Sequence, residues 1–488
     1  MTGVERIELG RGLQVSRLLT GLWQVADIER SEALDPKAAA GDLQPYLDAG
    51  LTTFDMADHY GSAELIVGAL GEHLSGLAKF EALTKWVPEP GPISLSQARA
   101  AVERALARLG CEQIDLMQFH AWCYWHPGYL DGLFHLQELQ QEGLIRHLGV
   151  TNCDAAHLNL ILASGIRVVS NQVCFSLLDA RPRGPLSDVC AAHGVKLLAY
   201  GTLAGGFLTE RWLGRPEPKP ETWSEMKYKR FIDTAGGWDA LQNVLRALAQ
   251  VARRHDVSMA NVASRYVLEQ PAVAGIIVGA RPGRSDHIED NLRVFDFTLD
   301  AESQATLAAA ISQLEPIPGD SGDEYRRPPY LTASGDLSDH VDVLPAPFEA
   351  VDGQRGRQRA FSGVSWEDLA GYCRAIRHGN RVSVSGTTAS HGDRLIGGND
   401  PAAQTHFTID KIEGALRSLG GSLEDVVRTR VFVSDASNWE PVARAHGSRF
   451  ASIQPANTLV EARLIGDEYL VEIEAEAVID PSAPAASQ

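Results

Sequence analysis

The stretch LTTFDMADHYGSAELIVGAL (residues 51–70) decides the fold. It opens with an apolar, β-branched run over 51–57 and continues through a glycine-containing turn into an amphipathic segment. A near-continuously apolar strand that leads into a helix is the repeating unit of a parallel sheet covered by helices. The stretch therefore predicts a strand with Asp55 at its carboxyl end, followed by a helix.

The same unit recurs along residues 15–315. Helix signals separate the strands: Ser94 and Gln97, for example, make a capping box for a helix that stops at Gly110. Eight repeats fit a (β/α)8 TIM barrel of the α/β class better than an open doubly wound sheet. The segment RIELGRGLQV (6–15) predicts a hairpin that closes the barrel bottom. The eight predicted strands lie at 16–21, 51–57, 80–86, 114–120, 146–152, 167–173, 195–201 and 274–280.

The pattern changes after Pro316, where Pro, Gly, Asp and Arg leave little apolar surface to bury until about Ala360. Beyond it the sequence predicts a hairpin over 374–386, a long helix after Asp400, a second helix and three further strands. Two helices against one mixed sheet make a compact α+β domain. We expect the barrel and its tail over 1–343, a linker over 344–360, the second domain over 361–480 and a disordered tail over 481–488.

Composition limits the partners of the chain. The 488 residues carry 44 Lys and Arg against 63 Asp and Glu, a net charge of -19 that disfavours nucleic acid and anionic membrane surfaces. The six cysteines form no C-x-x-C pair, so neither a metal site nor a disulfide scaffold is expected. There is no N-terminal apolar segment and no long apolar run. We expect a cytoplasmic protein whose partners are small molecules or proteins.

Four titratable side chains follow neighbouring strands of the predicted barrel. Asp55 ends the second strand with Tyr60 shortly after it, Lys85 ends the third strand, and His120 ends the fourth. Such strand ends form the functional face of a parallel barrel. Each residue alone has an ordinary explanation, as a helix cap, a solvated charge or a core histidine. Their coincidence at consecutive strand ends favours one shared site.

These four residue types make a proton donor. A phenol titrates near ~10, and an adjacent ammonium lowers that pKa, so we expect Lys85 to lower the pKa of Tyr60. A carboxylate at Asp55 would hold the lysine charged and aimed, and His120 would donate to a substrate oxygen. Together they can protonate a carbonyl that becomes an alkoxide.

Several motifs carry a family resemblance. The segments FDMADHYGSAE (54–64), LTKW (83–86) and DLMQFH (115–120), continued by GVTN, NQV, AYG and HIEDN, are similar to those of the aldo-keto reductase superfamily over about residues 5–340. The resemblance implies that Tyr60 is the general acid and that Asp55 and Lys85 tune it. His120 would orient the carbonyl for hydride transfer from a nicotinamide.

The resemblance also implies NADPH (NADP+) as the cofactor. Either Arg281 or Arg284 would pair with its 2'-phosphate, because a planar guanidinium suits that group. The implied contacts are Thr151, Asn152 and Gln172 for the carboxamide, Tyr200 for the nicotinamide ring, Leu203 to Gly206 for the pyrophosphate, and Gly279, Arg281, Arg284, Asp290 and Asn291 for the adenosine end.

Three tryptophans follow strand ends and are predicted to wall a substrate pocket: Trp23, Trp86 and Trp122. The alternative for Trp23 and Trp86 is that they only pack the loops.

Residues 361–480 resemble the reactive intermediate deaminase (RidA/YjgF) family, whose members are trimers that hydrolyse enamines or imines at subunit interfaces. Tyr372 and Glu472 match its pocket tyrosine and its water-positioning acid. The carboxylate-binding arginine of the family is replaced by Asn457, which offers no bidentate cation. The domain is therefore expected either to bind or hydrolyse a neutral imine, or simply to trimerise the chain.

The sequence thus indicates a bifunctional oxidoreductase: an NADPH-dependent carbonyl reductase acting on an aldehyde or ketone, fused to an imine deaminase-like module that forms a homotrimer. Two alternatives stay open. The barrel could act as an NADPH-binding redox sensor or scaffold with little turnover, or it could run as an NADP-dependent sugar or alcohol dehydrogenase.

Overall fold

A computed structural model of the chain describes residues 3–25, 35–73, 80–281, 283, 287–326 and 344–480. Among the helices of these segments, none combines the length and apolar character needed to span a bilayer. The terminal segment 481–488, expected to be a disordered tail, lies outside the described residues.

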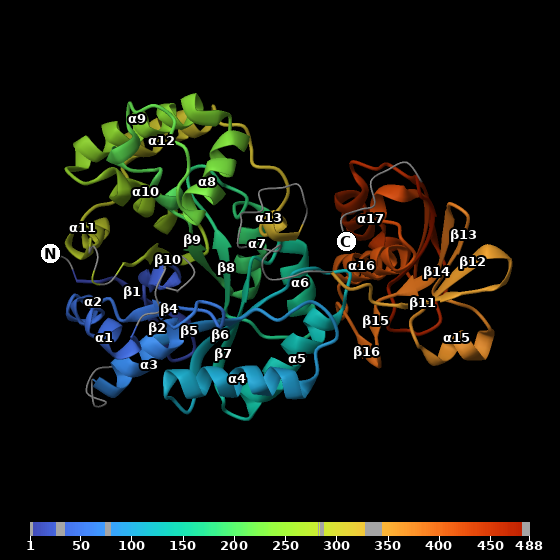
Figure 1. The fold of residues 1–488 in the computed structure, drawn as a ribbon. Coiled ribbons are helices and arrows are strands. Elements are labelled where there is room, and N and C mark those ends of the chain that lie inside the picture. The colour runs from blue at the N-terminus through green and yellow to red at the C-terminus, as the bar shows by residue number, and fades with distance from the viewer. Residues whose placement is uncertain are drawn as a thin grey trace.

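The N-terminal part is a closed barrel of eight parallel strands, which confirms the predicted TIM barrel (Figure 1). Each strand pairs with the next along the chain, and the last pairs with the first. The predicted strands all form, within a few residues of their expected bounds. They are β3 (Leu18–Gly21), β4 (Thr53–Asp55), β5 (Glu81–Trp86), β6 (Ile114–His120), β7 (Ile145–Thr151), β8 (Ser170–Cys174), β9 (Lys196–Tyr200) and β10 (Val273–Gly279).

Helices surround this barrel, and local capping residues set their ends. The predicted capping box of Ser94 and Gln97 opens α4, and Gly110 ends it in the left-handed conformation that glycine favours. The main helices of the barrel are α1 (Pro36–Gly41), α2 (Gln44–Asp48), α3 (Ala63–His73), α4 (Leu95–Leu109), α5 (Gly128–Gln141), α6 (Ala155–Ala163), α7 (Pro185–His193), α8 (Trp223–Thr234), α9 (Gly237–His255), α10 (Met259–Leu268), α11 (Ile288–Leu292), α12 (Ala301–Ile311) and α13 (Asp323–Arg326).

The predicted N-terminal hairpin forms from β1 (Arg6–Gly10) and β2 (Leu13–Ser16), which pair antiparallel. Its buried side chains, Leu9, Leu13 and Val15, pack in one apolar cluster with interior leucines of the barrel strands. The hairpin closes the amino-terminal end of the barrel, so the carboxyl ends of the strands are left to build a site.

The C-terminal part is a seven-stranded mixed sheet with two long helices, α16 (Pro401–Ser418) and α17 (Trp439–Phe450), which confirms the predicted α+β domain. A short helix, α15 (Ser365–Ala370), and a small hairpin of β15 (Ser390–His391) and β16 (Arg394–Leu395) accompany them. Asp400 caps α16 with its side chain, as the Asp-Pro pair predicts. The strands are β11 (Glu349–Asp352), β12 (Arg357–Phe361), β13 (Ala375–His378), β14 (Arg381–Thr388), β17 (Val426–Val433), β18 (Ala456–Glu461) and β19 (Val471–Val478).

The expected linker over 344–360 is largely wrong. Within it β11 and most of β12 add two antiparallel strands to the edge of this sheet, next to β13. Most of their side chains are exposed or only half-buried. A strand that buries few side chains does not need alternating apolar residues. Its polar composition therefore predicts a linker, although its backbone is paired in the sheet.

The two domains pack against each other through α6 and α16, which lie side by side at the junction in Figure 1. His157 of α6 donates to both oxygens of Asp154 at 2.8 Å and to Asp410 of α16 at 3.1 Å. The side chains of His157 and Asp410 are 6% and 1% exposed. The Tyr124 ring stacks on His157 at 3.4 Å, so the junction holds a buried ionic cluster.

Apolar and cation–π contacts complete the junction. The Arg417 guanidinium lies 3.7 Å from the ring centroid of Trp125, and Arg394 lies 4.2 Å from that of Phe134. Phe407 of α16 belongs to the same buried cluster as the core of the barrel. The second domain is therefore docked on the helices of the barrel.

Candidate active site

A buried ion pair forms the floor of the predicted site. Lys85, on β5, donates to both oxygens of Asp55 at 2.8 Å and to the Met56 carbonyl at 2.7 Å. The two side chains are 3% and 5% exposed. Because β4 and β5 are neighbours in parallel register, their carboxyl ends bring the two residues together.

Tyr60 lies over this pair, on the turn after β4. Its ring centroid is 4.9 Å from the Lys85 Nζ, and the rings of Trp23 and His59 pack edge-on against it at 5.0 and 4.8 Å. The structure thus brings Asp55, Lys85 and Tyr60 together as the sequence predicts.

The expected direction of the Tyr60 pKa is wrong for this structure. Burial, the Asp55 carboxylate and the neighbouring Tyr325 raise the pKa of Tyr60 well above its usual value. The largest cause is burial, which disfavours the charged phenolate, and the Asp55 carboxylate adds to it. Tyr60 is therefore a neutral phenol that holds its proton.

His120, the last residue of β6, completes the quartet. It is 4% exposed, and neither ring nitrogen has a hydrogen bond of normal geometry. Burial and the Arg326 guanidinium hold the pKa of His120 well below its usual value, so the imidazole is neutral. A neutral imidazole with an unpaired ring N–H is a suitable donor to an incoming carbonyl oxygen.

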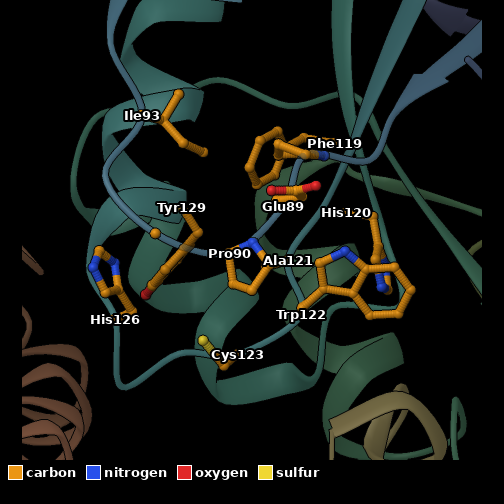
Figure 2. A pocket seen from close by; sticks show the side chains of 12 residues that line it. Glu89, Pro90, Ile93, Phe119, His120, Ala121, Trp122, Cys123, His126 and Tyr129 are labelled. Atoms are coloured by element: carbon orange, nitrogen blue, oxygen red, sulfur yellow. The ribbon is translucent and has the colours of Figure 1, made fainter. Parts of the chain in front are cut away.

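A small pocket beside His120 is too small for a substrate. Figure 2 shows the Trp122 indole next to His120, with Ile93 and Phe119 on the apolar side of the pocket. Its volume of about 10 Å³ offers room for roughly one water molecule.

The residues expected to hold a nicotinamide carboxamide lie at the ends of β7 and β8. The Thr151 hydroxyl is buried and has no hydrogen-bond partner, which is what a residue awaiting a polar ligand shows. Asn152 accepts a hydrogen bond from the Tyr200 hydroxyl at 2.8 Å, and Gln172 donates to Asp55 at 2.7 Å. Asn152 uses its side-chain oxygen and Gln172 its side-chain nitrogen in these bonds, so the other end of each amide can face a ligand. The three residues therefore fit the carboxamide of the implied cofactor.

The segment from Leu203 to Gly206 follows β9, and both of its glycines have a positive φ, which glycine adopts most readily. A side chain at Gly205 would collide with the ring of Tyr228, whereas one at Gly206 would meet no atom within 4 Å. Gly206 therefore leaves its backbone open to a ligand, as expected for a pyrophosphate contact.

The residues expected to bind the adenosine end of the cofactor are only partly within the described segments. Arg281, just after Gly279, is exposed and donates to the Gln24 side chain at 2.8 Å, whereas Arg284 lies outside the described residues. The Asp290 carboxylate accepts from Ser258 and Asn261. Asp290 thus connects α11 to the start of α10, while the neighbouring Asn291 is half-buried.

The three tryptophans separate into two groups. Trp23 packs edge-on against Tyr60, and Trp122 packs edge-on against His120 at 4.5 Å, so both lie at the catalytic side chains. Trp86 packs instead against Phe119 at 5.6 Å. Since Lys85 points into the barrel, its neighbour Trp86 points out to the helix layer, which is the packing alternative.

Two residues that the sequence analysis did not select also reach the site. The Lys227 Nζ, from α8, contacts the Tyr325 hydroxyl and lies 5.3 Å from the centroid of the Tyr200 ring. The Tyr325 ring, from α13, packs edge-on against His120 at 5.5 Å. Neither residue follows a barrel strand, and strand-end position was the signal that selected the others.

The comparisons with known proteins agree with this geometry. The sequence model of the Aldo/keto reductase family matches residues 17–312, which span the whole barrel. The chain belongs to this family. An aldo-keto reductase of Mycobacterium sp. (strain MCS) is 27% identical over 306 residues, covering 62% of this chain and 90% of that protein. The barrel of this aldo/keto reductase family member is accordingly an oxidoreductase.

One solved structure shows the same fold as the barrel. The glycerol dehydrogenase of Gluconobacter oxydans is 24% identical, with a TM-score of 0.52 over 65% of this chain and 96% of that one. The second domain, residues 364–479, matches the Endoribonuclease L-PSP model and is of the RidA type. A protein of Streptomyces coelicolor is 39% identical to it over 121 residues, covering 25% of this chain and 90% of that protein.

The residues predicted for a site in the second domain separate within one chain. Tyr372 and Glu472 gather around Arg374, which is 4% exposed and donates to the Gly386 carbonyl. Asn457, on β18, lies elsewhere and donates to Thr429 at 2.8 Å. Asn457 faces the helices, as Thr429 does, whereas Glu472 alternates with the core residue Ile473 and faces away from them.

Proposed function

We propose that the barrel is an NADPH-dependent reductase of aldehydes or ketones. The observation that carries this proposal is the buried Asp55–Lys85 pair beneath Tyr60, with a neutral His120 beside them. A neutral phenol and a neutral imidazole can both donate to one carbonyl oxygen, and these two hydrogen bonds stabilise the negative charge that develops there. The raised pKa of Tyr60 keeps its proton in place until that charge appears.

The cofactor supplies the hydride in this scheme. Thr151, Asn152 and Gln172 would hold its carboxamide, and Tyr200 would support the nicotinamide ring. Arg281 and Arg284 remain the candidates for a 2'-phosphate, which favours NADPH over NADH. The test is to follow the oxidation of NADPH and of NADH by the purified protein with a panel of aldehydes and ketones. Reduction with a clear preference for NADPH is expected, and equal rates with both would contradict the cofactor assignment.

For the second domain we propose a homotrimer that binds or hydrolyses an imine or enamine. Water would add to the C=N carbon and the nitrogen would leave as an amine or ammonia, which frees a carbonyl that the barrel can reduce. Burial and the neighbouring Glu474 raise the pKa of Glu472, which suits a carboxylate that takes a proton from water. The six cysteines are free thiols, in keeping with the cytoplasmic location that we propose.

This second proposal predicts an effect of Glu472→Gln. The variant should lose most of its imine hydrolysis, because an amide cannot accept the proton, while carbonyl reduction by the barrel continues. Ammonia release from an imine generated in the assay measures the first activity, and NADPH oxidation measures the second. Unchanged imine hydrolysis in Glu472→Gln would leave the domain with binding or assembly alone.

A further inference from the structure

Residues 121–127, which we call the β6–α5 loop, lead from the candidate active site toward the second domain. The loop starts directly after His120, and its Trp122 indole packs edge-on against that imidazole with 4.5 Å between ring centroids (Figure 2). Its next two aromatic residues, Tyr124 and Trp125, are buried as Trp122 is. Because Trp122 lies at His120, the course of this loop determines the apolar wall beside the imidazole.

One face of α16 is directed at the barrel. Phe407, Asp410, Gly414 and Arg417 follow one another at intervals of three or four residues, so they lie on the same face of this helix. Phe407 belongs to the buried cluster that includes the core of the barrel. The other three positions lie further along the same face, where α16 meets the β6–α5 loop.

Arg417 holds the loop at Trp125. Its guanidinium lies 3.7 Å from the centroid of the Trp125 ring. The Glu413 carboxylate orients this guanidinium, since Arg417 donates to one of its oxygens at 3.0 Å and Arg449 of α17 donates to the other at 3.0 Å. A cation fixed in this way over an aromatic ring restrains the position of the ring.

Gly414 lets the helix approach the backbone of the loop. A Cβ atom at this position would lie 2.7 Å from the carbonyl oxygen of Trp125 and 2.6 Å from the Cγ of Pro347, so a larger residue would have to displace its neighbours. Glycine in the interior of a helix weakens that helix. Here it allows α16 to contact the main chain of the loop directly.

A second route from α16 reaches the loop through His157. Asp410 accepts a hydrogen bond from His157 at 3.1 Å and one from Arg449 at 2.5 Å. The His157 ring stacks on the ring of Tyr124, with 3.4 Å between centroids and 8° between planes. Asp410 therefore fixes the ring on which Tyr124 packs, so the second domain restrains two neighbouring residues of the loop, Tyr124 and Trp125.

We propose that α16 of the second domain positions the β6–α5 loop and thereby sets the substrate range of the barrel. Arg417 and Asp410 are positioning residues in this scheme: they act through the two aromatic side chains that they restrain, and the loop transmits the restraint to Trp122. The substrates that need this wall are aldehydes with a flat aromatic body, because an aromatic ring packs well on an indole. A short aliphatic aldehyde does not need it. The inference rests on the proposed reduction of carbonyls by the barrel.

The test compares kcat/KM for benzaldehyde and for propanal in variants of the full chain at saturating NADPH. Arg417→Met removes the planar cation and keeps a long side chain, and Asp410→Asn removes the charge that holds His157. In each variant the ratio of benzaldehyde to propanal should fall by about threefold or more, within the range for loss of one aromatic contact. The fraction of folded protein cancels in this ratio, so a partly unfolded variant still gives a valid result.

Asn159→Ala is the matched control. Asn159 crosses the same junction from α6, but it donates to Asp400 at 2.7 Å, about three turns of α16 before Asp410. Its replacement removes a hydrogen bond between the domains at a distance from the β6–α5 loop. Asn159→Ala should therefore keep the aldehyde ratio of the unmodified protein.

Hydrogen exchange of the backbone amides of residues 121–127 separates this inference from the reductase proposal. Arg417→Met should speed their exchange by about tenfold through local opening, and Asn159→Ala should not. If the unmodified protein reduces neither aldehyde, the reductase proposal fails and the exchange alone decides whether α16 positions the loop. The inference is overturned if Arg417→Met leaves this exchange unchanged. It is equally overturned if either α16 variant keeps the aldehyde ratio of an active unmodified protein, or if Asn159→Ala lowers that ratio as much.

Discussion

The Asp55–Lys85 pair shows at the scale of single residues how the site is stabilised. Each charge is almost fully removed from water, so each depends on the other. Removing one partner of such a pair leaves a buried, uncompensated charge and costs about 3–5 kcal/mol. We expect Lys85→Met to lower the free energy of unfolding of the barrel by that order in urea denaturation.

The double variant Asp55→Asn, Lys85→Met serves as its control. It removes both charges, so it should recover much of the lost stability while remaining inactive in NADPH oxidation. Lys85→Met with the stability of the unmodified protein would contradict the view that the pair depends on mutual neutralisation.

At this scale the sequence predicts which catalytic residues meet, but not their protonation. Asp55, Tyr60, Lys85 and His120 could be selected because strand ends converge in any parallel barrel. The pKa of Tyr60 is raised mainly by burial of its side chain, and the spacing of residues along the chain does not predict how deeply a side chain is buried. The sequence left two roles open for Trp86, in the pocket wall or in loop packing. A shift of one position along a strand moves a side chain from the barrel interior to the helix layer, and the sequence alone does not fix that position.

The contact between α6 and α16 carries a pH dependence at the scale of elements. Burial acts to lower the pKa of His157, but Asp154 and Asp410 outweigh it and raise the pKa to about 9. An unfolded histidine titrates near ~6.5, so the folded state holds this proton more tightly. Its stabilising contribution is complete below about pH 6.5 and is lost as the pH rises through about 9.

His157→Gln should remove this dependence. The difference in unfolding free energy between the two proteins should shrink by on the order of 3 kcal/mol between pH 6 and pH 10, at 1.36 kcal/mol per unit of pKa. Lys411, whose pKa burial lowers to about 7, contributes an opposite slope, but it does so in both proteins. A difference that stays constant over this range would contradict the buried ionic contact.

The elements themselves were largely predictable where they bury apolar surface or carry a cap. The eight barrel strands and the Ser94 capping box are cases of this kind. The sequence analysis did not predict β11 and β12, because most of their side chains stay exposed or half-buried. Only their backbone pairing identifies them as strands. The His157–Asp410 contact joins residues far apart in sequence, and no local pattern connects them.

At the scale of the whole molecule, the docking of α16 on the barrel leaves the opposite face of the second sheet for assembly. Val427 and Val460, on β17 and β18, are 47% and 44% exposed on that face. We expect the full chain to form a trimer, with a mass by light scattering three times that of the 52.8 kDa chain. A single-chain mass at micromolar concentration would contradict it.

The central claim is that the barrel reduces carbonyls by protonation from Tyr60, and the most direct test compares Tyr60→Phe with the unmodified protein. The measurement is single-turnover NADPH oxidation with the best aldehyde of the panel, with NADPH affinity determined separately. Tyr266→Phe, a buried tyrosine remote from the quartet, is the matched control.

The account predicts that Tyr60→Phe binds NADPH as tightly as the unmodified protein but reduces the aldehyde 10² to 10⁴ times more slowly, the range for loss of a general acid. Tyr266→Phe should keep its rate. Equal rates in Tyr60→Phe and the unmodified protein would contradict the account, and so would tight NADPH binding with no turnover of any carbonyl by either one.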